Sequence, residues 1–355
     1  NKKTEMNYLR KNVNVPSTAL NTEELIYSSQ QRNLVYNYDF KYFSNQKNDS
    51  GSIVYNHPDG WVYNNLGKDA QISSSDNSCR IVVNTAGNEM SLKQALHEFP
   101  RYENYLQDKS ISLQAEVELS ENCTLEVSLF NGIKKVSQEI TSTDKGLYVF
   151  NIQLEITGSP SELTCALLSK TEGAIISINK VFANIGFIAI ETLPSIITDV
   201  IGERKQYIAT ENPPAEELSL CNAPIELDEN QTRLNSVLNG RFGIGNNGNS
   251  LLLDMRGYFS RAWDNGSTID PNATDRTIPG KGTLTGDHVS TFEQDDFLKH
   301  DHGLDFTVST AQSTTGGTGP NTNLVSSPAS KTNEEANGKE TRPKNIYELY
   351  TIKWA

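Results

Sequence analysis

Two histidines, His300 and His302, have a spacing in this sequence that suits metal binding. In a β-strand, residues i and i+2 face the same side, so both imidazoles would point together while Asp301 faces away. Two imidazoles alone make a poor metal site, and an isolated pair of this kind is usually a polar surface feature. A three-fold axis would bring six imidazoles together, the octahedral number that suits Fe(II), Ni(II) or Zn(II). The spacing therefore leaves a surface pair and an axial metal site as alternatives.

Hydrolytic chemistry is a further alternative for the same histidines. A zinc site within one chain could use His288 with His300 and His302, and Asp295 or Asp296 would then serve as the base. Glycan cleavage would need a pair of carboxylates, and nothing singles such a pair out of the 44 acidic residues. The sequence has no Gly-x-Ser-x-Gly elbow, no His-Glu-x-x-His motif and no Walker loop. We therefore expect a binding protein and not an enzyme.

The charge of the chain argues against several classes of partner. Its 355 residues carry a formal charge of −13, and no Lys/Arg cluster exceeds a few residues. Nucleic acid and anionic lipid are therefore poor partners. The mean hydropathy of −0.52 allows only modest cores, which an elongated oligomer could share between its chains. The most apolar stretch, Ile175 to Ile201, is interrupted by polar residues, so we expect no membrane-embedded segment.

Residues 31–195 should form the scaffold, because their pattern is that of β-strands throughout. Apolar and polar residues alternate in the runs 112–119 and 148–156, and turn clusters such as 130–132 and 144–146 separate the runs. Several short strands with turns at this spacing predict a β-sandwich. Three of the four cysteines lie in strand-like runs, which favours buried thiols over a disulfide scaffold.

Two short helices are expected outside the strands. Asn21 followed by Glu24 has the pattern of a capping box, ahead of Leu25. Residues 232–238 have the pattern of a short amphipathic helix.

The first part of the β-rich region carries a family resemblance. Residues 33–40, Asn-Leu-Val-Tyr-Asn-Tyr-Asp-Phe, and the later 58–61, Pro-Asp-Gly-Trp, resemble the opening of jelly-roll carbohydrate-binding modules, with Tyr38 in place of the usual Gly. The resemblance implies a jelly-roll sandwich that binds sugar, since aromatic rings offer a flat apolar face to a pyranose. Trp61 and Tyr63, which share one face, are then the candidate sugar contacts. The alternative is that Trp61 closes the sandwich core.

The pattern changes after about residue 196, where prolines punctuate a mixed stretch. Residues 243–248 match the dinucleotide fingerprint G-x-G-x-x-G, but a helix pattern precedes them and no helix follows, so we reject a nucleotide site.

The same glycines belong to a longer match. Residues 242–248 and 253–266, ending Arg-Gly-Tyr-Phe-Ser-Arg-Ala-Trp-Asp-Asn-Gly, resemble the phage tail-collar family. Residues 213–223 resemble its Pro-Pro segment, although no Trp precedes Cys221 and Asn-Ala replaces Asp-Gly. Arginines here, such as Arg256 and Arg261, are expected to pair with carboxylates such as Asp254 and Asp264.

The resemblance continues to the end of the chain. Residues 292–302 are similar to the His-x-His segment of the family, and 340–347 to its closing Glu-Thr-Arg-Pro-Lys-Asn. This implies an intertwined homotrimer with a structural metal ion, Fe or Zn, held on the three-fold axis by His300 and His302. Residues 307–330 have no charged side chain, and their composition alone is that of a flexible linker. The resemblance implies instead that they form the receptor-contacting tip. Its candidate contacts with a glycan or an outer-membrane protein are Thr314, Thr318, Asn321 and Asn323.

Taken together, the sequence predicts a mainly β protein. We expect residues 1–30 to be a linker or the end of a fibre shaft and residues 31–195 to form a jelly-roll sandwich. Residues 196–285 should form a tail-collar domain, and residues 286–355 a metal-clipped, intertwined trimeric β tip. The expected function is that of a trimeric fibre-tip adhesin, extracellular, on a virion tail fibre or a bacterial cell surface. The alternatives are a glycan-degrading or zinc-dependent hydrolase on a tail-fibre scaffold, and a chromosomally encoded adhesin or contractile-injection fibre.

The axial metal site predicts a definite stoichiometry. Light scattering with elemental analysis should find a trimer with about one metal ion per three chains, because one axial site serves three copies. The variant His300→Ala/His302→Ala should lose the metal. A monomer with one zinc ion per chain would contradict the axial site and favour the hydrolase.

Overall fold

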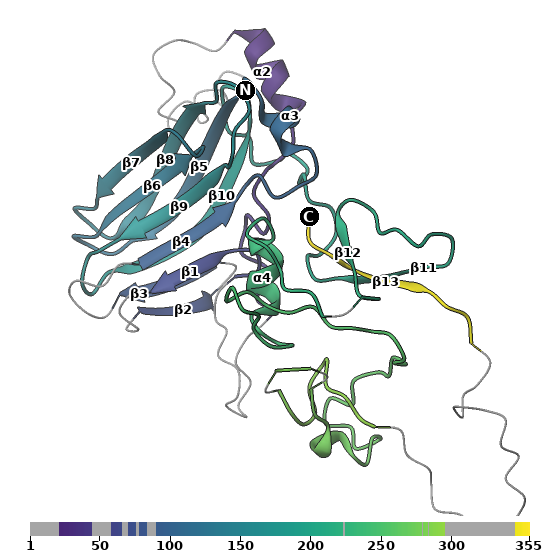
Figure 1. Cartoon of the computed structure of the whole chain (residues 1–355). Coiled ribbons are helices and arrows are strands. Elements are labelled where there is room, and N and C mark those ends of the chain that lie inside the picture. The colour runs from purple at the N-terminus through teal and green to yellow at the C-terminus, as the bar shows by residue number, and fades with distance from the viewer. Residues whose placement is uncertain are drawn as a thin grey trace, which may run out of the picture. The chain divides into compact units, whose positions relative to one another are not determined.

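The computed structural model describes residues 21–44, 58–65, 70–75, 78–83, 90–222, 224–278, 280–282, 284–294 and 345–355. By compactness the chain divides into one unit of residues 1–293 with 348–355 and a second of residues 294–347. All the elements below belong to the first unit (Figure 1). Within the described residues, no helix is long and apolar enough to cross a bilayer.

Two antiparallel five-stranded sheets form a β-sandwich, as the alternating pattern predicts (Figure 1). Sheet A has the order β1-β4-β9-β6-β7 and sheet B the order β2-β3-β10-β5-β8. Consecutive strands often lie in different sheets, so the chain crosses repeatedly between the two layers. The strands of sheet A are Val62–Asn65, Met90–Ala95, Thr164–Ser169, Thr124–Phe130 and Lys135–Thr141 in that order. Those of sheet B are Ala70–Ser75, Ser78–Val83, Ile175–Ile185, Ser110–Leu119 and Gly146–Glu155.

The sandwich core follows from the period of two in its strands. In β5, every second residue from Ile111 to Leu119 is buried, and of the residues between them only Ser112 is buried as well. The thiols of Cys79, Cys123 and Cys165 are buried and free, which confirms the prediction for these three. Burial raises the pKa of the Cys165 thiol to about 12, against smaller opposing effects of a backbone hydrogen bond and the Arg233 charge.

The segment before the first strand is fixed by local polar contacts. Helix α2 (Thr22–Ser29) begins with the predicted capping box, in which Asn21 and Glu24 each accept the other's backbone N–H at 2.8 and 2.9 Å. Ser28 at its end packs on Gly186, where a Cβ would lie 2.3 Å from the Ser28 hydroxyl. A glycine is therefore required where the helix meets sheet B.

A smaller antiparallel sheet follows the sandwich. Its order is β11-β13-β12, with bounds Arg204–Tyr207, Leu349–Lys353 and Glu217–Ser219. The last strand of the chain thus lies between two strands that precede it by more than a hundred residues. The other elements are α3 (Tyr102–Leu106), α4 (Thr232–Leu238), as predicted, and the 3-10 turn η1 (Ala273–Asp275).

The ion pairs of residues 254–293 match the sequence expectation in part. Arg256 pairs with Asp254 at 2.7 Å, as expected. Arg261 lies instead 3.4 Å from Glu293, and the Asp264 carboxylate accepts the backbone N–H of Thr268. Asp264 is occupied by its own loop, which is why it is not available to an arginine.

Helix α4 is joined to the sandwich by two buried charges. Glu98 of the sandwich accepts the backbone N–H groups of Thr232 and Arg233 at 2.7 and 2.9 Å, and so caps a helix whose own N-cap makes no side-chain bond. The Arg233 guanidinium donates back to the carbonyls of Glu98 and Leu34, both at 3.1 Å. Glu98 is 1% exposed and Arg233 is fully buried. The two charges therefore compensate each other between the sandwich and the segment that follows.

This buried pair should dominate the stability of the first unit. Arg233→Met should lower the free energy of unfolding by about 3–5 kcal/mol, because Glu98 would remain buried without a compensating cation. As a control, Arg256→Met at an exposed position should lower the free energy of unfolding by less than about 1 kcal/mol. Urea denaturation followed by circular dichroism measures both, and equal losses would contradict a special role for Arg233.

Candidate functional site

Trp61 lies in the core of the sandwich and not on its surface. Its side chain is fully buried, its ring lies 5.2 Å from that of Phe40, and its indole N–H donates to the carbonyl of Asn37. The structure therefore supports the core interpretation of Trp61. A fully buried ring has no free face for a sugar, which corrects its assignment as a sugar contact.

Tyr63 is partly buried in the same region. It lies on β1 opposite Leu92 of β4, on the face of sheet A that turns toward the core. Its hydroxyl is buried and, among the described residues, has no hydrogen-bond partner. Burial raises the pKa of this phenol to about 12. The predicted face shared by Trp61 and Tyr63 is thus an inner face.

The other predicted site residues lie outside the described residues. They are His300, His302, Thr314, Thr318, Asn321 and Asn323. In the parts of the chain that the structure describes, no group of three or more His, Cys, Asp or Glu side chains is placed to hold a metal ion.

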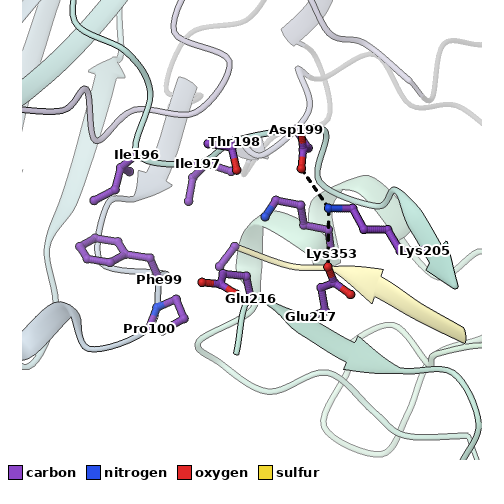
Figure 2. A pocket seen from close by; sticks show the side chains of 11 residues that line it. Phe99, Pro100, Ile196, Ile197, Thr198, Asp199, Lys205, Glu216, Glu217 and Lys353 are labelled. Atoms are coloured by element: carbon purple, nitrogen blue, oxygen red, sulfur yellow. Dashed lines mark hydrogen bonds and ion pairs between the residues drawn. The ribbon is translucent and has the colours of Figure 1, made fainter. Parts of the chain in front are cut away.

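A cavity of about 400 Å³ lies where the sandwich meets the small sheet, and we call it the junction cavity. Figure 2 shows it from close by, with the side chains of the sandwich wall on one side and those of the small sheet on the other. One wall comes from the loop after β4 and from the chain leaving the sandwich; its residues are Phe99, Pro100, Ile196, Ile197, Thr198 and Asp199. The other wall comes from the small sheet and its flanks; its residues are Lys205, Glu216, Glu217, Lys353 and Ala355.

The first wall contains four apolar side chains beside Thr198 and Asp199; Pro100 and Ile196 are partly exposed, and Phe99 and Ile197 are almost fully covered. Ile197 is 4% exposed, and the ring of Phe99 packs edge-on against Tyr105 at 5.6 Å. Phe99 follows Glu98 directly, so the loop that caps α4 also fixes this wall. His97 strengthens the loop, because its Nδ1 lies 3.1 Å from the backbone nitrogen of Leu163. The apolar wall is therefore held rigidly by the sandwich.

A network of charges centred on Lys205 of the opposite wall reaches across to Asp199 of the first wall. Its ammonium lies 2.9 Å from Asp199 and 3.6 Å from Glu217. The Lys205 ammonium holds the pKa of the Asp199 carboxyl below its usual value. Glu217 is 6% exposed and also accepts the hydroxyls of Tyr207 and Thr351, at 2.8 and 2.5 Å. These two carboxylates thus already have partners.

Lys353 differs from Lys205 in having no such partner. Its side chain ends strand β13 and is 4% exposed. In Figure 2 its amine extends toward the apolar wall and carries no dashed line. Among the described residues, no carboxylate lies within 4 Å of this amine. Burial lowers the pKa of the Lys353 ammonium, and Lys205 lowers it further. The cavity therefore presents an amine without a carboxylate partner, at the end of a largely buried side chain.

Sequence reasoning did not identify this cavity. Its walls come from segments near residues 99, 197, 205, 217 and 353, which only the fold brings together. The small strands have three to five residues, too few for a periodic pattern to mark one face. The change of pattern near residue 196 marked the boundary where the cavity lies, without indicating its residues.

A separate feature is the exposed apolar surface of the loop-rich segment after Met255. Phe259, Trp263 and Ile269 are 70%, 51% and 82% exposed. Single exposed apolar side chains are ordinary, but three large ones within eleven residues are typical of a surface that another chain covers.

The comparison with family models found no match. A segment of the chain is 32% identical over 124 residues to Protein RhiB of Rhizobium leguminosarum bv. viciae, covering 34% of this chain and 56% of RhiB. The chain thus spans about half the length of this relative.

Similar solved structures include two carbohydrate-binding modules and a tailspike. TmCBM61 in complex with beta-1,4-galactotriose is 11% identical, with 43% of this chain and 97% of that chain covered and a TM-score of 0.32. The CBM22-1 xylan-binding domain of Paenibacillus barcinonensis Xyn10C is 14% identical, with 36% of this chain and 86% of that chain covered and a TM-score of 0.28. Tailspike protein 4 of bacteriophage CBA120 is 13% identical, with 43% of this chain and 21% of that chain covered and a TM-score of 0.33. Similarities this low carry nothing about what this chain binds.

Tyr63 offers a direct test of whether its hydroxyl serves the fold or a ligand. Tyr63→Phe should raise the free energy of unfolding by about 1 kcal/mol, because it removes a buried hydroxyl without a hydrogen-bond partner. Glycan binding should not change. Chemical denaturation and glycan affinity of the same preparation provide the two measurements, and a loss of affinity with unchanged stability would restore Tyr63 as a sugar contact.

Proposed function

We propose that this chain is a glycan-binding attachment protein, which contacts a cell surface as part of a trimeric fibre tip and catalyses no reaction. The observation that carries the proposal is the junction cavity, where the apolar side chains of Pro100 and Ile196, backed by Phe99 and Ile197, lie opposite amines and carboxylates. A sugar ring has apolar C–H faces and polar hydroxyl edges, so it needs both kinds of wall. The volume of about 400 Å³ lies in the ordinary range for small-ligand sites.

Binding is favoured over catalysis by the state of the carboxylates in the cavity. A glycosidase needs a general acid whose pKa is raised, so that it keeps its proton near neutral pH. Lys205 acts on Asp199 in the opposite direction and lowers its pKa. Glu217 is held by Lys205 and two hydroxyls, an arrangement that suits a fixed structural role.

The trimeric fibre tip is supported by two independent features. Residues 242–266 resemble the tail-collar family over a long segment. The exposed side chains of Phe259, Trp263 and Ile269 lie within or just after that segment, and two further copies of the chain would cover them.

In this proposal the remaining parts have defined roles. His300 and His302 hold a structural Fe or Zn ion on the three-fold axis. Thr314, Thr318, Asn321 and Asn323 contact a glycan or an outer-membrane protein at the tip. The assembly is extracellular, on a virion tail fibre or a bacterial surface.

A trimer should bind a glycan-coated surface far more strongly than a monomer. Linking three weak sites on one rigid body should raise the apparent affinity about a hundredfold. The comparison uses the whole chain and the variant Phe259→Ser/Trp263→Ser, whose polar residues should prevent association, on biosensors coated with bacterial polysaccharides. Val62→Ser, which changes one exposed apolar side chain of sheet A, is the matched control and should stay trimeric.

Two results would contradict the proposal. Equal binding by the trimer and the monomeric variant would exclude attachment through multiple sites. Failure of the whole chain to bind any polysaccharide on an array would exclude the glycan-binding function itself.

A further inference from the structure

Lys353 is in an environment that leaves its charge uncompensated. Its side chain is 4% exposed, and the carboxylates of the cavity do not reach it within 4 Å. Burying a charge is unfavourable unless a partner compensates it. The effect of the surroundings is visible in the lowered pKa, because burial and Lys205 together outweigh the attraction of Asp199, Glu216 and Glu217.

Two of the three nearby carboxylates, Asp199 and Glu217, already have partners, and the third, Glu216, is exposed and lies more than 4 Å from the Lys353 amine. Asp199 is bound to Lys205 at 2.9 Å, and Glu217 accepts two hydroxyls besides its pairing with Lys205. Lys353 itself is fixed by the backbone, because its N–H donates to Glu203 at 2.9 Å and its carbonyl accepts from Gly202 at 2.9 Å. The amine thus stays directed into the cavity with room for an external partner (Figure 2).

We propose that the junction cavity binds a carboxylate-bearing sugar, such as a hexuronic acid, with its carboxylate on the Lys353 amine and its ring against the wall of Phe99, Pro100 and Ile197. This inference rests on the proposed glycan-binding function and names the class of sugar. A carboxylate supplies the negative charge and the hydrogen-bond acceptors that the buried amine lacks. The ring fills the space that a small anion would leave empty beside the apolar wall.

The lining also selects against other anions. The cavity wall includes three carboxylates, Asp199, Glu216 and Glu217, which repel a doubly charged phosphate more strongly than a singly charged carboxylate. A bare carboxylate such as acetate would gain the contact with Lys353 but none with Phe99 or Ile197. A neutral sugar would gain the apolar contact and leave the Lys353 charge uncompensated. Only a ligand with both features uses both walls.

Isothermal titration of the whole chain with glucuronate, glucose and acetate tests this inference. Glucuronate should bind the wild-type chain more tightly than glucose and acetate. Lys353→Met should weaken glucuronate binding about tenfold or more, the loss expected for one hydrogen bond to a charged group. Lys353→Arg, which keeps the charge, should retain most of the affinity. Lys145→Met, at an exposed lysine in the turn between β7 and β8, should bind as wild type does.

Folding does not obscure the result. Lys353→Met removes an uncompensated buried charge, so its thermal midpoint should equal or exceed that of the wild type. A glucuronate affinity that is the same in Lys353→Met and in the wild type would overturn the inference, as would preference for glucose. In both cases the chain still binds saccharide, so the proposed function would stand. A chain that binds no saccharide on the polysaccharide array would refute both.

Discussion

The structure depends on the way in which two buried charges, Glu98 and Arg233, join the sandwich to the chain that follows it. Glu98 caps helix α4, and Arg233 of that helix returns to the carbonyls of Glu98 and Leu34. Either charge alone would be costly to bury, but the charge of each residue compensates that of the other. The contact fixes the loop that contains Phe99, and with it one wall of the junction cavity.

The second wall forms because the last strand, β13, pairs with two strands that come much earlier in the sequence. Strand β13 lies between β11 and β12, and this pairing brings Lys353 next to Lys205 and Glu217. Residues that are far apart in sequence thus line one small cavity. The backbone of the small sheet holds the largely buried Lys353 in place there. The site is therefore a consequence of tertiary contacts on both sides.

This origin explains which features the sequence could predict. The alternation in β5, the capping box at Asn21 and Glu24, and the helix of residues 232–238 are local patterns, and the structure confirms them. Trp61 could not be placed from its residue type, because a Trp suits both a core and a sugar platform; its packing on Phe40 decides for the core. Lys353 and Lys205 were not predicted, because no local pattern distinguishes an unpaired buried lysine from an exposed one.

The local chemistry of the cavity also differs from the average charge of the chain. At a net charge of −13, the long-range field would repel an acidic sugar, but that field is screened over about 8 Å at physiological salt. An amine on a largely buried side chain, such as that of Lys353, acts at contact distance, where screening by salt is weak. In the proposed site, affinity for an acidic glycan would therefore depend on the Lys353 amine and its surroundings, and not on net charge. In the proposed trimer, three such weak sites would suffice for attachment, because the copies would act together.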